Sequence, residues 1–241
     1  TFSEPPPTFV RNVLIEDFQG TWCVFCPRVS WAIHLLEQQT NDIVVIGIHD
    51  DDEMDRVNFG PLANLINLSG FPTAQIDRMT SWNFPESENL DQVLDIAGTE
   101  AQLGLSVEST KNGNQVTGTV SVTFSQTYGQ ALELVIYLVE DDLIYDQRNT
   151  YDNLYDGQDP IPNFEHDGVL SYLETNILGE SISQTTAGFE YSRDFSFDIP
   201  TSIVNDENLK IAAFVIDAET NDALNAREGA VGALADYQEF E

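Results

Sequence analysis

Apolar positions along the first hundred residues follow two different spacings. The run from Val13 to Phe18 has the pattern of a buried strand, and the apolar residues after Pro27 recur at helical intervals. Further strands are predicted at 43–49 and 74–77, a helix at about 57–68, and a last helix near 90–103. Residues 11–102 are therefore expected to alternate strands with helices.

After Gly98 the pattern changes to an alternation of apolar and polar residues, which is typical of strands with one buried face. Turn residues such as those at 111–114 separate the segments. The predicted strands are 103–108, 116–124, 131–139, 189–197, 209–217 and 223–227. We therefore expect residues 103–241 to form an all-β, Ig-like antiparallel sandwich of about seven short strands.

Residues 141–180 lack this alternation and are expected to be a long insertion between strands. The segment carries four of the eight tyrosines, together with Pro160, Pro162 and His166. Connections of that length are functional or disordered, and the aromatic residues argue against disorder. His166, beside Asp167, is expected to be a hydrogen-bonded structural histidine.

The size and composition of the chain agree with two domains. At 241 residues and 41% hydrophobic content, the chain can bury two modest cores. No apolar run approaches the roughly 20 residues that span a bilayer. Residues 1–10 are expected to be a spacer, since Thr1–Pro7 is typical of a mature stem from which a targeting segment has been removed, or of a disordered chain end. Membrane anchoring would then depend on the removed N-terminal lipid or signal segment.

Acidic residues dominate the charge of the chain. With 41 aspartates and glutamates against 9 lysines and arginines, the formal net charge is −32. Such a charge disfavours nucleic acid and anionic membrane surfaces as partners. A net charge of this size suits a protein in a salty medium or one that binds divalent cations. Solubility in a salty medium is the simplest explanation of the charge.

Both cysteines of the chain lie in one C-x-x-C motif, between the first predicted strand and the first predicted helix. Pro27 fits the first turn of that helix, where its missing N–H costs nothing. Cys23 is therefore predicted at or just before a helix N-terminus, where the helix dipole favours a thiolate and lowers the cysteine pKa. Cys26 lies one turn further on, close enough to attack a mixed disulfide formed by Cys23.

Two other interpretations of the cysteine pair stay open. The pair could form a plain structural disulfide, which is the serious alternative. It could also supply half of a zinc site, but zinc needs two more ligands, and His34, His49 and His166 form no H-x(3–5)-H pair. Zinc is therefore disfavoured.

A second segment, Ser69-Gly70-Phe71-Pro72-Thr73, precedes the predicted strand at 74–77. It resembles the loop in which thioredoxin-fold proteins carry a cis-proline opposite the C-x-x-C motif. Pro72 is the cis-proline candidate, and an ordinary trans turn proline is the alternative. A proline there removes one backbone N–H and presents the neighbouring backbone groups to an extended substrate.

With both motifs, residues from about 11 to 100 resemble the thioredoxin superfamily. The resemblance implies an α/β thioredoxin-like domain at 11–102. It also implies that Asp17 is buried beneath the cysteines and relays protons to the second thiol, and that Trp22 shields the cysteine pair. Glu16 points to the other face of the strand and is expected to be solvated. The apolar dipeptide Val24-Phe25 departs from the family, so no redox potential is implied.

The whole chain also resembles a narrower family, the bacterial outer-membrane-associated lipoproteins related to a twenty-eight-kilodalton outer membrane protein. Its members join a thioredoxin-like domain with a G-x-W-C-x-x-C-P motif, matched here by residues 20–27, to a β-rich domain with an H-x-x-V-L segment, matched by residues 166–170. The resemblance implies an envelope address, periplasmic or outer-membrane-associated. It leaves the biochemical role open.

Two acidic clusters are candidate cation sites. One is the segment 49–53, and the other is a loop with Asp152, Asp156 and Asp159 beside Gly157. Calcium takes six to eight oxygen ligands, but neither segment follows the calcium-loop pattern. A solvated acidic turn is the default, and a calcium site in the second loop is the alternative.

Two functional classes follow. The first is a cell-envelope thiol:disulfide oxidoreductase that acts on protein thiols or disulfides and requires no cofactor beyond its own disulfide. In this class Cys23 attacks the substrate and Cys26 resolves the mixed disulfide. Asp17 moves the proton, and the Pro72 loop docks the substrate. The second is a non-catalytic surface or adhesin-like binding protein, with the acidic sandwich and the tyrosine-rich insertion as its working face. Fold alone does not decide between them.

Overall fold

The computed structural model describes residues 6–84 and 89–241, so the first five residues of the predicted spacer lie outside it. Strands account for 43% of the structure and helices for 11%. The helices are α1 (Pro27–Glu37), α2 (Gly60–Leu65) and α3 (Asp91–Leu94), with a 3-10 turn at Tyr155–Gly157. The strands are β1 (Phe9–Val10), β2 (Val13–Gln19), β3 (Ile43–His49), β4 (Thr73–Ile76), β5 (Thr80–Ser81), β6 (Glu100–Ala101), β7 (Leu103–Asn112), β8 (Gln115–Phe124), β9 (Leu132–Glu140), β10 (Leu143–Gln147), β11 (Ile161–His166), β12 (Val169–Leu173), β13 (Glu180–Ser181), β14 (Glu190–Asp198), β15 (Leu209–Asp217), β16 (Ala223–Ala230) and β17 (Leu234–Ala235).

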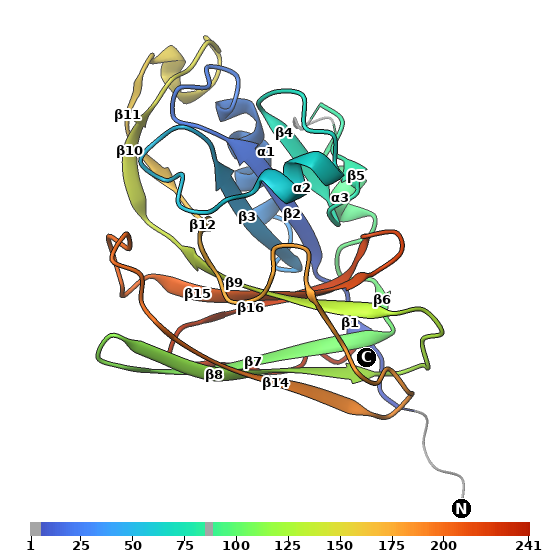
Figure 1. Cartoon of the computed structure of the whole chain (residues 1–241). Helices are drawn as coiled ribbons and strands as arrows, with labels where there is room; N and C mark the ends of the chain where they lie inside the picture. The colour runs from blue at the N-terminus through green and yellow to red at the C-terminus, as the bar shows by residue number, and fades with distance from the viewer. Residues whose placement is uncertain (1–5, 85–88) are drawn as a thin grey trace, which may run out of the picture.

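One sheet runs through both halves of the chain. Among the described residues it has nine strands, in the order β16-β15-β9-β12-β3-β2-β4-β5, with β13 beside β9. Strand β12 joins the two halves, because Val169 pairs in parallel with Gly47 of β3 and antiparallel with Glu140 of β9 (Figure 1). Gly168 makes this junction possible: its φ is +62°, and a Cβ there would lie 2.5 Å from the carbonyl oxygen of Val45.

The predicted fold class, an α/β thioredoxin-like domain followed by a separate all-β sandwich, is wrong. The molecule is predominantly β, and strands from both halves belong to one continuous sheet. The prediction failed because of the segment 141–180, which was expected to be an insertion. This segment supplies β12, the strand that links the two halves. The boundary at residue 102 stays a prediction, and the sheet crosses it.

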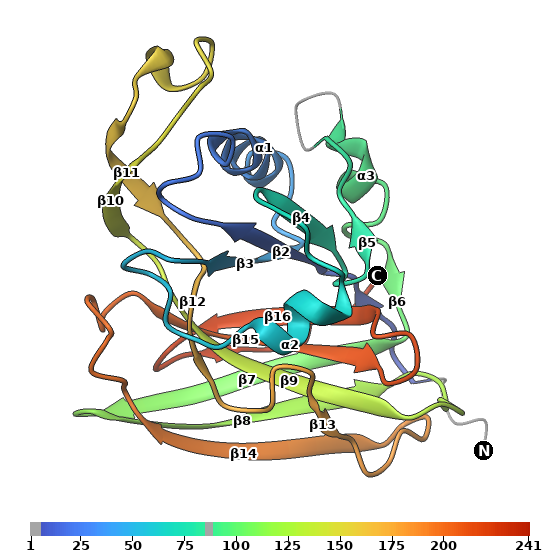
Figure 2. The ribbon, with the colours of Figure 1, turned by 45° about the horizontal axis from the view of Figure 1, so that its top comes forward.

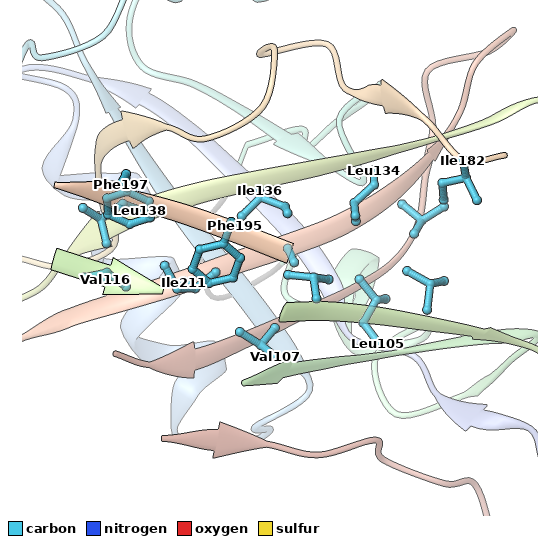
Figure 3. Close-up of a cluster of buried hydrophobic side chains, with 14 of the residues drawn as sticks. Leu105, Val107, Val116, Leu134, Ile136, Leu138, Ile182, Phe195, Phe197 and Ile211 are labelled. Carbon is cyan, nitrogen blue, oxygen red and sulfur yellow. The ribbon is translucent and has the colours of Figure 1, made fainter. Parts of the chain in front are cut away.

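A four-stranded sheet, β14-β8-β7-β17, packs face to face on β9 and β15. Alternate residues of each strand meet in this layer, among them Val107 of β7, Phe195 of β14, Ile136 of β9 and Ile211 of β15 (Figure 3). The strand predicted at 209–217 is confirmed with its bounds.

The main sheet bends at β12, so that β2 and β3 lie over the opposite face of β9 and β15 (Figure 2). Leu14 and Phe18 of β2 share one core with Tyr137 of β9 and Phe214 of β15. On the outer face of β2, helices α1 and α3 cover a third core. No helix among the described residues is both long and apolar enough to cross a membrane.

Glu16 is buried by this bend, which corrects the prediction that it is solvated. Its carboxylate accepts hydrogen bonds from Arg78 Nη2 at 2.9 Å and Nε at 3.3 Å, and both side chains are fully buried. Arg78 Nη2 also donates to the hydroxyl of Tyr137 at 3.0 Å, and its guanidinium lies 4.8 Å from the ring centre of Phe214. Although burial acts to lower the pKa of Arg78, the charge of Glu16 raises it above its usual range. The face expected to be open to water is therefore closed by β9 and β15.

Candidate functional site

Cys23 and Cys26 form a disulfide at the start of α1. Pro27 is the first helical residue, which agrees with its predicted place in the first turn, and Cys26 is the N-cap residue. Cys23 lies one turn earlier, and its carbonyl accepts the N–H of Cys26 at 3.2 Å. Unpaired N–H groups of a helix N-terminus favour a cysteine thiolate here once the disulfide is reduced.

The pair is nearly closed to solvent. Cys23 is 3% exposed and Cys26 is fully buried. Because both sulfurs are bonded to each other, the oxidised protein offers no thiolate for zinc.

Asp17 lies near the end of β2, on the strand face that α1 covers. Ile15, two residues earlier on the same face, packs in the core with Val29 of α1. Strand β2 leads from Asp17 into the cysteine loop, and α1 begins directly after Cys26. Asp17 is 1% exposed, and neither of its carboxylate oxygens has a hydrogen-bond partner in the described structure. Burial raises its pKa to about 8.

Asp17 is expected to make folding stability depend on pH. The folded protein holds a proton up to pH of about 8, whereas an unfolded aspartate loses it near 4. Between these values the native state binds more protons, so the free energy of unfolding should fall as pH rises, by at most about 1.4 kcal/mol per pH unit. Urea denaturation of the oxidised protein at pH 5 and pH 8 measures this difference. It should shrink in Asp17→Asn and persist in Asp95→Asn, an exposed control; an unchanged difference in Asp17→Asn would contradict the assignment.

The loop before β4 approaches the cysteine loop through aromatic contact. The Phe71–Pro72 peptide bond is cis, as predicted from the sequence. The ring of Phe71 lies edge-on to Trp22, with centroids 5.5 Å apart. Trp22 is 44% exposed and donates from Nε1 to the carbonyl of Asp50 at 2.7 Å. Trp22 therefore stands between the disulfide and the Pro72 loop.

The first acidic cluster has a structural use. Asp52 accepts hydrogen bonds from the backbone N–H of Thr21 and from Nδ1 of His49, both at 2.8 Å. Burial acts to raise the pKa of Asp52, but the hydrogen bond and charge of His49 lower it below its usual value. Asp52 thus anchors the start of the cysteine loop.

Residues 143–166, which form β10, the 3-10 turn and β11, make an arm that rises beside α1 (Figure 2). The backbone N–H groups of Arg148 and Thr150 donate to the carbonyls of Thr21 and Val24, at 2.8 and 3.0 Å. The arm therefore holds the cysteine loop along its length, and it accounts for part of the burial of Cys23.

One buried side chain of the arm, Gln147, reaches the cysteine loop directly. Its Nε2 donates to the carbonyls of Gly20 at 3.2 Å and Cys23 at 3.0 Å, while its Oε1 has no partner in the described structure. Sequence reasoning missed Gln147, because a glutamine in a segment that was expected to be an insertion gives no sign of contact more than a hundred residues away.

Gln147→Ala is expected to speed the reduction of the native disulfide by dithiothreitol about tenfold, since losing hydrogen bonds of about 1 kcal/mol each loosens the arm from the loop. The rate of thiol appearance under native conditions measures this. Gln115→Ala, an exposed site at the edge of β8, is the matched control. A rate unchanged from the wild type would show that the arm does not limit access.

The second acidic loop, where calcium was the alternative to a solvated turn, has one of its three aspartates in an ion pair. Asp159 is bound by Arg148, with Nε to Oδ1 at 2.7 Å and Nη2 to Oδ2 at 3.0 Å. In the part of the chain that is described, the acidic side chains whose oxygens converge within 4.8 Å are Asp142, Glu165 and Asp167, not Asp152, Asp156 and Asp159. The sequence alone could not show that a basic residue of the same arm occupies Asp159.

A cleft of about 660 Å³ opens between α1, the arm and the end of the main sheet. Asp17 and His166 both line this cleft. His34, expected on the exposed face of α1, is exposed and lies at the same cleft. Sequence reasoning did not place Asp17 and His166, which lie on distant strands, in one wall.

Comparison with known proteins identifies the relatives of this chain. Residues 61–234 match the family described as outer membrane protein Omp28. The match includes the Pro72 loop and the arm, and it does not reach Cys23 and Cys26. A comparison with curated proteins finds no match.

Among solved structures, HBP35 of Porphyromonas gingivalis is similar with a TM-score of 0.72 and 18% identity, over 93% of this chain and 76% of that one. At that identity the likeness concerns the fold. A domain of the outer membrane lipoprotein Omp28 from the same organism aligns with a TM-score of 0.38 and 17% identity, over 55% of this chain and 89% of that one.

Proposed function

The chain belongs to the outer membrane protein Omp28 family, and from that premise we propose that it acts as a thiol:disulfide oxidoreductase. Family membership assigns the protein to the cell envelope, in association with the outer membrane. Disulfides persist in such surroundings, outside the reducing cytosol.

The observation that carries the proposal is Asp17. A buried carboxyl with two unpartnered oxygens costs stability, and it is not needed to hold a structural disulfide. With a pKa of about 8, it carries a proton at neutral pH and can still release it. Asp17 lies near the end of the strand that leads into the cysteine loop, and exchange at the cysteine pair requires such a group, because a buried thiolate needs a proton when it leaves.

The exchange runs in balanced steps. A partner thiolate attacks Sγ of Cys23, the Cys23–Cys26 bond breaks, and Cys26 leaves as a thiolate with the electron pair. Asp17 then gives its proton to Cys26 and becomes a carboxylate. In the opposite direction that carboxylate takes the proton of the Cys26 thiol, and the resulting thiolate attacks the mixed disulfide at Cys23, releasing the partner.

The surroundings of the pair support a protein partner. Trp22 is partly exposed beside the pair, and Phe71 of the cis-proline loop packs against it. Pro72 has no N–H, so the neighbouring backbone groups of this loop are the ones that pair with an extended substrate chain. The substrates are therefore protein thiols or disulfides, and no cofactor beyond the Cys23–Cys26 couple is required.

A specific observation favours the second candidate, a non-catalytic binding protein. Cys23 is 3% exposed and the arm is bonded along the cysteine loop, so a partner reaches the sulfur only if the arm shifts. If the arm stays closed, the disulfide is structural and the exposed surfaces are the working part of the protein.

Trapping separates the two candidates. Reduced Cys26→Ser, mixed with an oxidised model protein, should accumulate a mixed disulfide through Cys23, seen as a covalent adduct by mass spectrometry. Cys23→Ser is the matched control and should form none. The absence of an adduct with Cys26→Ser, in protein shown to be folded by circular dichroism, would reject the oxidoreductase in favour of the binding protein.

A further inference from the structure

The cleft beside α1 has a wall of aromatic rings that the exchange reaction does not use. Trp31 of α1 lies edge-on to Tyr155 at 5.5 Å, Tyr155 to Phe164 at 5.3 Å, and Phe164 to His166 at 4.8 Å between centroids. All four side chains line the cleft. The faces of such rings are electronegative and attract cations.

Two residues that line this cleft carry buried polar atoms without a hydrogen-bond partner in the described structure. These atoms are acceptors or carboxyl oxygens. They are Nε2 of His166, which is 3% exposed, and both oxygens of Asp17. Burial, and then the charge of His49, lower the pKa of His166 to about 3, so its ring is neutral. A neutral imidazole held through its other nitrogen accepts a hydrogen bond at Nε2. A ligand group that satisfies Nε2 of His166 must therefore donate a hydrogen bond.

The rim of the cleft is acidic. Lys210 already binds Asp141 at 2.7 Å and Glu228 at 3.1 Å. Three further carboxylates line the cleft without a salt bridge among the described residues: Glu37, Glu165 and Asp167. Desolvation, and then the charge of Asp167, raise the pKa of Glu37, although the charges of His34 and Lys210 act to lower it, so the carboxylates of Glu37 and Asp167 repel each other across the cleft. A cation between them would relieve this repulsion.

We propose that this cleft binds an organic cation with an apolar stem, an alkylammonium or guanidinium group, whose charged end lies between Glu37, Glu165 and Asp167 while its stem packs on Trp31 and Phe164. The volume of about 660 Å³ is in the usual range for a small-molecule site. Inorganic cations fit less well, because the rings of Trp31, Tyr155 and Phe164 in the wall offer them no oxygen ligands. The site goes beyond the proposed disulfide exchange and does not depend on it.

Phenethylammonium is the test ligand, with 2-phenylethanol and 3-phenylpropanoate as the neutral and anionic controls of similar shape. Isothermal titration of the oxidised full chain should give a Kd for the ammonium at least tenfold below that of the alcohol, with no binding of the carboxylate. Its affinity should fall with added salt. The proposal would be overturned if the ammonium and the alcohol bound equally well, or if the carboxylate bound. It would also be overturned if phenethylammonium did not bind at about 10 mM, which is on the order of the weakest useful affinity.

Variants locate the site. Glu165→Gln with Asp167→Asn should weaken phenethylammonium at least tenfold, and Phe164→Leu should weaken it severalfold. Glu108→Gln with Asp198→Asn removes the same charge from the four-stranded sheet and should leave the Kd unchanged. Equal weakening in both double variants would show general attraction to an acidic protein and no site.

A competition arm identifies the source of the cation. Capped tripeptides with a central lysine or arginine should displace phenethylammonium if the natural ligand is a basic side chain of a polypeptide. Failure of the peptides, with retained binding of the free amine, assigns the cleft to small amines. Neither readout involves the cysteines, so a failed exchange reaction leaves this test intact.

Discussion

Replacing Arg78 by methionine is expected to lower the free energy of unfolding by about 3–5 kcal/mol, because Glu16 would be left as an unpaired charge in a closed core. Both side chains are fully buried, and Tyr137 and Phe214 surround the guanidinium. Denaturation by urea, followed by tryptophan fluorescence, measures the loss.

Two further variants show whether the cause is the unpaired charge. The double variant Glu16→Leu with Arg78→Met should recover most of the lost stability, since a buried ion pair is often replaced by apolar residues at little cost. Lys111→Ala, which breaks a pair at the surface, should cost less than about 1 kcal/mol. If the double variant were no more stable than Arg78→Met, the packing of Arg78 would matter more than its charge.

Asp17→Asn is expected to slow disulfide exchange at pH 7 about a hundredfold, the usual contribution of a positioned acid or base. Asparagine keeps the shape of the side chain but cannot deliver a proton to Cys26. The rate at which the oxidised protein reacts with a reduced model protein measures the effect across pH 6 to 9, around the pKa of about 8.

The pH profile separates proton transfer from a structural effect. The wild-type rate should show a transition that belongs to Asp17, and this transition should be missing in Asp17→Asn. Asp17→Glu, which keeps a carboxyl, should retain part of the rate and the transition. A uniform loss in both variants, with the transition unchanged, would show that Asp17 only supports the local packing.

Local features of the fold follow from the sequence. Strands β3 and β15 have the predicted bounds, because the alternation or apolar run that marks a strand is contained in its own residues. The start of α1 at Pro27, the cis bond before Pro72 and the burial of Asp17 also agree with the predictions. The start of α1 depends on a few neighbouring residues, whereas the cis bond and the buried Asp17 were expected from the resemblance of the two motifs.

Features that depend on distant pairing were missed or wrong. Nothing beside Glu16 in the sequence indicates that Arg78, 62 residues later, meets it in a core. The segment 141–180 resembles a loop because its strands are short and interrupted by turn residues, yet β12 joins the two parts of the sheet and Gln147 holds the cysteine loop. The α/β assignment failed for the same reason. The resemblance to the thioredoxin superfamily covered the local motifs of the first half, but it did not include the strands that the second half of the chain adds to the main sheet.

The most direct test of the redox assignment is the equilibrium of the Cys23–Cys26 couple against glutathione, read as the fraction of disulfide by mass spectrometry after acid quenching. A redox-active pair should give a reversible potential above about −300 mV, on the side of the known exchange proteins. A potential below about −300 mV, or a disulfide that opens only when the protein unfolds, is the property of a structural bond and would contradict the account.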